Sequence, residues 1–184
     1  WLESGGLVQR LQDSDGVVLH VPPEKRTNLD FYKNNTIHFL LVPALLTRAL
    51  QAGVPRSELR EYVSWWLELY RWEFPLPDRD QLTIELDRWL AYYRETGALV
   101  GDAPDPAHAV VRLTSGVLES YREAYLIAAR TVTGQSEWPI SQRALIDRMR
   151  RQFATALLLG ETRKPEGASV VTFGNALSRF AELG

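Results

Sequence analysis

The stretch from Ser57 to Trp72 most restricts what this chain can fold into. Its polar residues return every three or four positions, which predicts a helix with one narrow polar stripe. The residues of this stripe are Ser57, Glu61, Ser64, Glu68 and Arg71. Three tryptophans, Trp65, Trp66 and Trp72, fall outside it. Because more than half of the circumference is apolar, other elements must cover this helix, and the sequence predicts an assembly of packed helices.

Further helices are expected from the same spacing and from the residues that commonly begin helices. We expect them from Asp30 to about Gln51 with a bend at Pro43, from Asp78 to about Thr96, and from Ser115, Ser141 and Ser169 onward. Ser57 is expected to cap the aromatic helix. Apolar positions expected to face the core are Leu82, Leu86, Trp89, Leu90, Tyr93, Leu118, Tyr121, Tyr125, Ala129, Val132, Leu145, Met149, Phe153, Ala156, Val170, Phe173, Leu177, Phe180 and Leu183.

A weak internal repeat predicts two β-hairpins. Each copy is a helix that ends at Gly, a short strand, a polar turn and a second strand. The strands are expected at residues 6–8 and 17–21 in the first copy, and at 97–100 and 110–113 in the second. The predicted fold is therefore mainly α, a single helical domain with two small β-hairpins in winged-helix-like helix-plus-hairpin repeats. Its sub-units are expected at about 1–77 and 78–184.

Composition excludes several classes of protein. The chain of 184 residues has no Cys, which excludes disulfides, Cys-ligated zinc and a thiol nucleophile. The net charge is −2, and the hairpin turns carry Asp13, Asp15, Asp102 and Asp105 where a DNA-binding wing would carry Lys or Arg. No nucleic-acid partner is therefore expected. No apolar run has the roughly 20 residues that a membrane span needs.

The sequence contains no recognisable catalytic constellation. Membrane acyltransferases of the glycerolipid pathway use His, four residues, then Asp, so that the Asp orients a His base. Counting five positions from each His reaches Lys25, Pro43 and Leu113, so this motif is absent. We therefore expect no catalytic, cofactor-binding or metal-binding residue in this chain, and no cofactor.

One polar cluster precedes the first apolar helix: Tyr32, Asn34, Asn35 and His38. Asn34 and His38 are four residues apart and share a helix face. His38 could act as a base that Asn34 holds, or the cluster could be a structural hydrogen-bonded ladder. We favour the structural interpretation, because no carboxylate or nucleophile stands at a recognisable spacing.

Two surface features could meet a partner. Trp65, Trp66 and Trp72 are typical of a contact with another domain or with the membrane interface. We favour domain contact, because Glu58, Glu61 and Glu68 would be repelled by an anionic leaflet. The second feature is a basic cluster of Arg143, Arg148, Arg150 and Arg151. We interpret it as a solvated face, and the alternative is a contact with anionic lipid or with an acidic partner.

Three segments resemble PlsB-type bacterial glycerol-3-phosphate acyltransferases in the region C-terminal to their catalytic domain. Residues 29–45 are similar to a helix of that family with the pattern Tyr-x-Asn-Asn-x-x-x-His…Pro. Residues 115–125 resemble the family's next helix, and residues 160–177 resemble its closing segment. The three segments follow the family's order.

The resemblance implies transfer of an acyl chain from acyl-CoA or acyl-ACP to the sn-1 hydroxyl of glycerol 3-phosphate, at the cytoplasmic face of the cell membrane. The family's catalytic residues lie upstream of the resembling segments, so none is carried over. We interpret this chain, which opens at Trp1, as a fragment whose partner is the missing N-terminal acyltransferase domain and which supports that domain. The alternative is a winged-helix-type regulatory or protein-interaction module.

Overall fold

The computed structural model describes residues 3, 5–13, 16–25, 36–136 and 138–184. The chain forms two compact units, Trp1–His38 and Phe39–Gly184. The predicted sub-units 1–77 and 78–184 do not coincide with this boundary. The two helices that flank residue 77 instead contact each other within the second unit.

The first unit contains a β-hairpin, and its side chains at residues 9–12 and 16–20 are exposed. Strands β1 (Gln9–Asp13) and β2 (Gly16–His20) pair in antiparallel register, with Leu11 opposite Val18. A short 3-10 helix, η1 (Pro23–Lys25), follows. The first strand begins three residues later than predicted, because Gly6 at φ +65° ends a turn closed by its N–H bond to the carbonyl of Glu3. The predicted hairpin is thus confirmed, with shifted ends.

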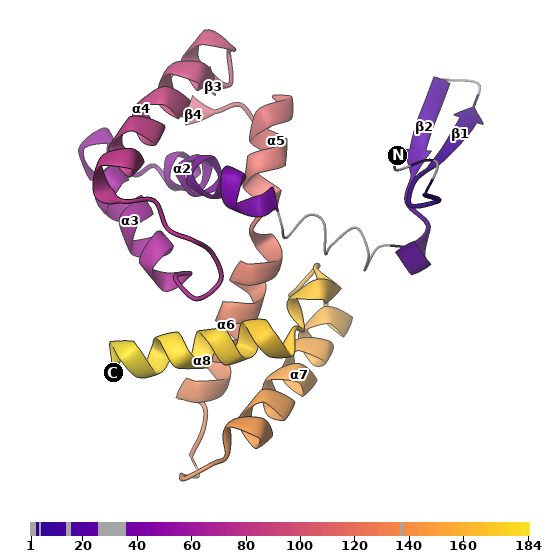
Figure 1. Cartoon of the computed structure of the whole chain (residues 1–184), viewed down its shortest axis with the longest axis vertical. Coiled ribbons are helices and arrows are strands. Elements are labelled where there is room, and N and C mark those ends of the chain that lie inside the picture. Colours follow the sequence, from indigo (N-terminus) through magenta and orange to yellow (C-terminus); the bar gives the residue numbers. More distant parts are fainter. Residues whose placement is uncertain (1–2, 4, 14–15, 26–35, 137) are drawn as a thin grey trace. The chain divides into compact units, whose positions relative to one another are not determined.

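The second unit is built almost entirely of helices (Figure 1). After η2 (Ile37–Leu40), which spans the boundary between the units, its elements follow one another in chain order. They are α2 (Leu41–Gln51), η3 (Arg56–Glu58), α3 (Leu59–Leu69), α4 (Arg79–Glu95), β3 (Leu99–Val100), β4 (Ala103–Pro104), α5 (Ala109–Gly116), α6 (Glu119–Thr133), α7 (Gln142–Leu158), η4 (Pro165–Gly167) and α8 (Val170–Leu183). Strands β3 and β4 pair in antiparallel register. The mainly α fold with two small hairpins is confirmed.

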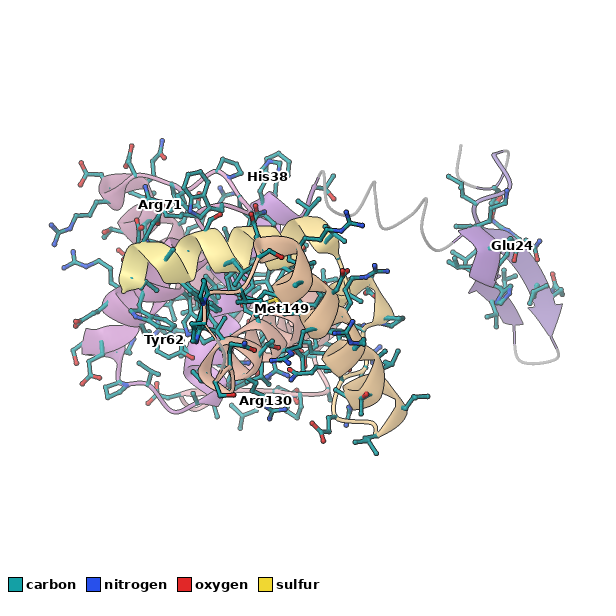
Figure 2. All side chains as sticks on the ribbon, turned by 90° about the horizontal axis from the view of Figure 1, so that it is seen from below. Glu24, His38, Tyr62, Arg71, Arg130 and Met149 are labelled. Carbon is teal, nitrogen blue, oxygen red and sulfur yellow. The ribbon has the colours of Figure 1, made fainter. Side chains whose placement is uncertain are left out.

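The helices of the second unit pack in two groups. Helix α2 contacts α3, α4 and α5, and in Figure 1 it lies between α3 and α4 on one side and α5 on the other. Helix α6 contacts α7, α8 and η4. Aromatic rings join the two groups, because Tyr70, which follows α3, meets Tyr125 of α6 with ring centroids 5.0 Å apart. Met149 of α7 is fully buried and lies amid these helices (Figure 2).

Three predicted helix starts are confirmed together with their caps. The Asp78 carboxylate accepts a hydrogen bond of 2.8 Å from the N–H of Gln81, and the side-chain oxygen of Gln81 accepts one from the N–H of Asp78. This reciprocal pair is a capping box. The hydroxyls of Ser141 and Ser169 likewise accept bonds from backbone N–H groups at the starts of α7 and α8. The last segment is therefore a helix, as its spacing predicts.

The predicted core is largely confirmed and shifts by one residue in α6. Leu82, Leu86, Leu90 and Tyr93 of α4 are buried, as are all four residues predicted for α7, and Trp89 is half-buried. In α6 the buried positions near the end are Ala128 and Thr131, whereas Ala129 and Val132 are half-buried. In α8, Phe173 is buried, and Leu177 and Phe180 are half-buried. The prediction is wrong for Val170 and Leu183, which are exposed at the two ends of this helix.

The predicted start and end of the aromatic helix are wrong. Ser57 does not cap it, because Ser57 lies inside the 3-10 turn that follows Pro55. The N–H of Glu58 donates to the carbonyl of Pro55 at 2.9 Å, and α3 begins only at Leu59. The helix ends at Leu69 rather than at Trp72, because the chain tightens there and the N–H of Glu73 donates to the carbonyl of Tyr70.

The strand predicted at residues 110–113 is also wrong, because these residues begin α5. Gly101, at φ +65°, turns the chain directly after β3, so that residues 103–104 supply the second strand. Val111 and Thr114, three residues apart, are both buried against α2. Tertiary burial on a helical spacing thus overrides the strand preference of consecutive valines. The helix predicted from Ser115 accordingly begins at Glu119, after a break that follows Gly116.

Pro43 lies in the first turn of a helix and does not bend the middle of one. Residues 26–35, where the predicted first helix starts, lie outside the described residues. Within the described part, a 3-10 turn covers Ile37–Leu40 and α2 begins at Leu41. Pro43 therefore lies in the first turn of α2, where its missing N–H removes no helical bond.

A buried hydroxyl cluster ties α2, α4 and α5 together. The hydroxyl of Thr47 lies 2.7 Å from that of Tyr93 and 2.7 Å from that of Thr114. It also donates to the backbone carbonyl of Pro43, four residues earlier in the first turn of α2. All three hydroxyl-bearing residues are inside the unit, so the cluster fixes the register of three helices.

We expect Tyr93→Phe to lower the free energy of unfolding by about 1 kcal/mol, the usual net value of a buried hydrogen bond. Urea unfolding of the purified chain measures this change. The matched control is Tyr92→Phe, at the neighbouring exposed tyrosine, which should change stability by less than about 0.5 kcal/mol. Equal losses in the two variants would contradict a structural role for the hydroxyl cluster.

Candidate interaction surface on the aromatic helix

The three predicted tryptophans differ in exposure. Trp65 of α3 is 58% exposed and Trp72, in the turn after α3, is 51% exposed, while Trp66 is half-buried. The expectation that part of this aromatic surface is exposed is confirmed. The solvent-facing rings are unusual for a soluble surface, because large aromatic side chains are mostly covered.

Trp65 and Trp66 form one aromatic group with Tyr62. The rings of Trp65 and Trp66 meet edge to face at 5.1 Å, and Tyr62 lies 6.3 Å from Trp66. The guanidinium of Arg48, from α2, lies 5.2 Å from the centroid of the Trp66 ring. This cation–π contact holds Trp66 against α2 and leaves Trp65 as the exposed edge of the group.

An open groove of about 490 Å³ runs beside this aromatic group. Its lining residues are Val54, Glu58, Glu61, Tyr62, Trp65 and Trp66. Glu58 and Glu61 are exposed at the groove, so aromatic rings and two carboxylates face the same space. Such a surface favours an apolar segment that carries Lys or Arg.

Trp72 belongs to a different contact. Its indole N–H donates to the Glu182 carboxylate of α8 at 3.1 Å, and its carbonyl accepts a bond from the Asn175 amide at 3.1 Å. Arg179 of α8 pairs with Glu182 at 2.8 Å and lies 3.9 Å from Glu68 of α3. The structure therefore joins Trp65 and Trp66 in one groove and ties Trp72 to α8.

A half-buried carboxyl follows Trp72. Glu73 accepts a bond of 3.2 Å from the Tyr125 hydroxyl of α6. Burial raises the pKa of Glu73 to about 7, although hydrogen bonds from Asn175 and Tyr125 favour the ionised form. Burial likewise raises the pKa of Tyr125 and of Tyr70. Glu73 therefore titrates near neutral pH at the junction of α3, α6 and α8.

The comparison with known families decides what this chain is. Residues 1–184, the whole chain, match the model of the glycerol-3-phosphate acyltransferase C-terminal region. The chain belongs to this family. The resemblance seen in three segments of the sequence is thus confirmed over the full length.

A glycerol-3-phosphate acyltransferase of Ectopseudomonas mendocina (strain ymp) is similar to this acyltransferase C-terminal region. The two are 29% identical over 101 residues, which are 50% of this chain and 12% of that protein. The matched part is thus a small share of the relative's length. No solved structure matches this chain.

The polar cluster of this acyltransferase region is described only at His38. Tyr32, Asn34 and Asn35 lie outside the described residues, so the structural interpretation of the cluster stays a prediction. His38 is half-buried in η2. Within the described residues, no group of three or more His, Asp or Glu side chains could hold a metal ion. No helix in the described part of the chain is long and apolar enough to cross a membrane.

Sequence reasoning missed the groups that Arg48, Glu73 and Asn175 form. For Glu73 a signal existed, because a carboxylate between Trp72 and Phe74 interrupts an aromatic run. For Arg48 and Asn175 no local signal exists, because their partners are Trp66 and Trp72, far away in the chain.

Proposed function

We propose that this chain is the C-terminal region of an enzyme that transfers an acyl chain from acyl-CoA or acyl-ACP to glycerol 3-phosphate. The product is lysophosphatidic acid, and the enzyme works at the cytoplasmic face of the cell membrane. Within that enzyme, the region supports the catalytic domain and performs no chemistry itself. The observation that carries the proposal is the match of residues 1–184 to the acyltransferase C-terminal family.

The partner of the aromatic groove is the remaining part of the same protein. The similar acyltransferase of Ectopseudomonas mendocina extends well beyond the matched region, which is 12% of its length. Trp65 offers an exposed anchor, and Glu58 and Glu61 offer charge for a basic segment of the partner. The tryptophan contact is thus assigned to protein rather than lipid, because carboxylates beside it would be repelled by an anionic leaflet.

The isolated chain should show no turnover of glycerol 3-phosphate with palmitoyl-CoA. In the full-length protein, Trp65→Ser should lower kcat at least tenfold or release a separately folded C-terminal region to proteolysis, because a central aromatic anchor contributes about 2 kcal/mol or more to a contact. Product formation and limited proteolysis measure the two effects.

The matched control is Trp138→Ser, because Trp138 is equally exposed at 58% but lies away from the groove. This variant should keep full activity. Turnover by the isolated chain would overturn the supporting role. Full activity of the Trp65 variant with unchanged proteolysis would overturn the assignment of the groove to the catalytic domain.

A further inference from the structure

The two halves of the second unit carry opposite net charge. Residues 142–184 contain seven Arg or Lys against four Asp or Glu, whereas residues 39–141 contain ten against fourteen. The excess of basic residues lies on α7, because the loop after it and α8 each carry equal numbers of basic and acidic residues. The aromatic groove of α3 belongs to the acidic part.

A basic groove lies between α6 and α7. It has a volume of about 560 Å³ and is lined by Arg130 and Ile127 of α6, by residues of α7 that include Arg148 and Arg151, and by Leu159 and Glu161 of the following loop. Arg130 pairs with Glu161 at 3.1 Å, and the Arg148 guanidinium bonds the side-chain oxygen of Gln135. Arg151 forms no ion pair within the described residues, and the three arginines that line the groove outnumber its one carboxylate, Glu161.

Exposed aliphatic side chains border the groove. Leu158, at the end of α7, is 89% exposed, and Leu159, which lines the groove, is 69% exposed. Leu158 follows Arg151 by seven residues, which places both on one side of α7. Val170 and Val171, at the start of α8, are also exposed, and α8 packs on α7 through the rings of Phe153 and Phe173. Nothing within the described residues covers these leucines.

We propose that this groove and its leucine rim form a docking surface for a bilayer that contains anionic phospholipid. Arg148 and Arg151 contact headgroup phosphates, and Leu158 and Leu159 enter the boundary between headgroups and acyl chains. Aliphatic side chains beside arginines fit this boundary, because the lipid surface is negatively charged above an apolar layer.

An acidic protein surface fits less well. It would pair with the arginines, but it offers no apolar layer for a leucine that projects directly away from the helix bundle. The carboxylates that oppose binding are Asp147, on the same helix, and Glu161, which lines the groove. Glu161 pairs with Arg130, and the neighbouring Arg143 and Arg150 outweigh Asp147. The inference deepens the proposed membrane location and rests on it only for the presence of a bilayer near the chain.

Vesicle binding by the 184-residue chain tests the proposal. The probes are vesicles of phosphatidylglycerol and phosphatidylcholine in equal amounts, and vesicles of phosphatidylcholine alone. We expect binding to the anionic vesicles only. Arg148→Gln/Arg151→Gln should weaken it about 30-fold, since each basic residue at an anionic surface contributes about fivefold. Leu158→Ser should weaken it about tenfold.

The controls make the same chemical changes on α4. Arg88→Gln/Arg94→Gln removes the same charge from exposed positions, and Ile84→Ser removes an exposed aliphatic side chain. These variants should bind as the unchanged chain does. Equal losses in the α4 and α7 variants would overturn the assignment to this surface, and so would the absence of binding to anionic vesicles.

A second readout locates the insertion. Because the chain has no Cys, Leu158→Cys and Ile84→Cys each allow one environment-sensitive fluorophore to be attached. The label at Leu158 should shift to shorter wavelength with anionic vesicles, and the label at Ile84 should not. Saturable binding of inorganic phosphate without any such shift would mean an anion groove and would overturn lipid docking. No acyl transfer is measured, so these outcomes are independent of the test of the proposed function.

Discussion

Replacing Glu123 by Ala should lower the free energy of unfolding by about 3–5 kcal/mol. Glu123, on α6, is only 2% exposed, and its two carboxylate oxygens accept bonds from the N–H groups of Arg163 and Lys164 at 2.8 and 2.9 Å. The substitution leaves two backbone donors without their partner in the loop that joins α7 to α8. Donors that lose a charged partner cost more than the net value of the bonds they made.

Two further variants separate this role from a general effect of charge. Glu123→Gln keeps one acceptor oxygen and should lose about half as much stability. Glu119→Gln, one turn earlier on α6, breaks a partly exposed pair with Arg122 and should cost about 1 kcal/mol or less. Denaturant unfolding gives the three values. If the Ala and Gln variants at Glu123 both lower the free energy of unfolding by only a small and equal amount, the carboxylate does not hold the loop.

Hydrogen exchange should locate the loss caused by Glu123→Ala. Helix η4 packs on α6, and a Cβ on Gly167 would meet the carbonyl of Ser120 at 2.8 Å, so the chain approaches α6 closely there. Faster exchange is expected first between the end of α7 and the start of α8.

The features that sequence reasoning predicted are those with local causes. The caps at Asp78, Ser141 and Ser169 depend on residues only three positions away, and the buried face of α7 depends on spacing within one helix. The family could likewise be predicted, because residues 29–45, 115–125 and 160–177 resemble segments of that family and follow in the same order.

The features that could not be predicted depend on distant partners. Glu123 contacts residues 40 and 41 positions later, and Thr47 meets Tyr93 and Thr114 across 46 and 67 positions. No residue near position 110 indicates that Val111 is buried against α2. The strand preference of the two valines therefore led to a wrong prediction of a strand at residues 110–113. The basic groove joins residues of α6, α7 and the following loop, and only packing brings Arg130 beside Arg151.

The stability of the chain should fall as pH rises from about 4.5 to about 7, because of Glu73. Its folded pKa of about 7 lies above the ordinary value of 4.5, so the folded state holds a proton that the unfolded state releases. The stabilisation from this proton is complete below pH 4.5 and is lost as pH rises to about 7. The loss amounts to about 3 kcal/mol, since one pKa unit corresponds to about 1.4 kcal/mol.

Glu73→Gln tests this directly, because Gln resembles the protonated carboxyl at every pH. The variant should match the unchanged chain near pH 4 and exceed it by about 3 kcal/mol near pH 8. The carboxylates of Glu119 and Glu182 have lowered pKa values and add stability as pH rises, so the difference between the two proteins, not the profile of either one, isolates Glu73. A difference that does not change with pH would contradict the prediction.

Tyr125→Phe supplies the opposite test at the same site. The Tyr125 hydroxyl donates to Glu73 and favours the ionised carboxylate, so its removal should raise the pKa of Glu73 further. The upper end of the pH range over which stability falls should therefore move to higher pH. The Glu73→Gln/Tyr125→Phe double variant should show no such shift. Since Glu73 lies where α3, α6 and α8 meet, its ionisation should destabilise the packing of these three helices.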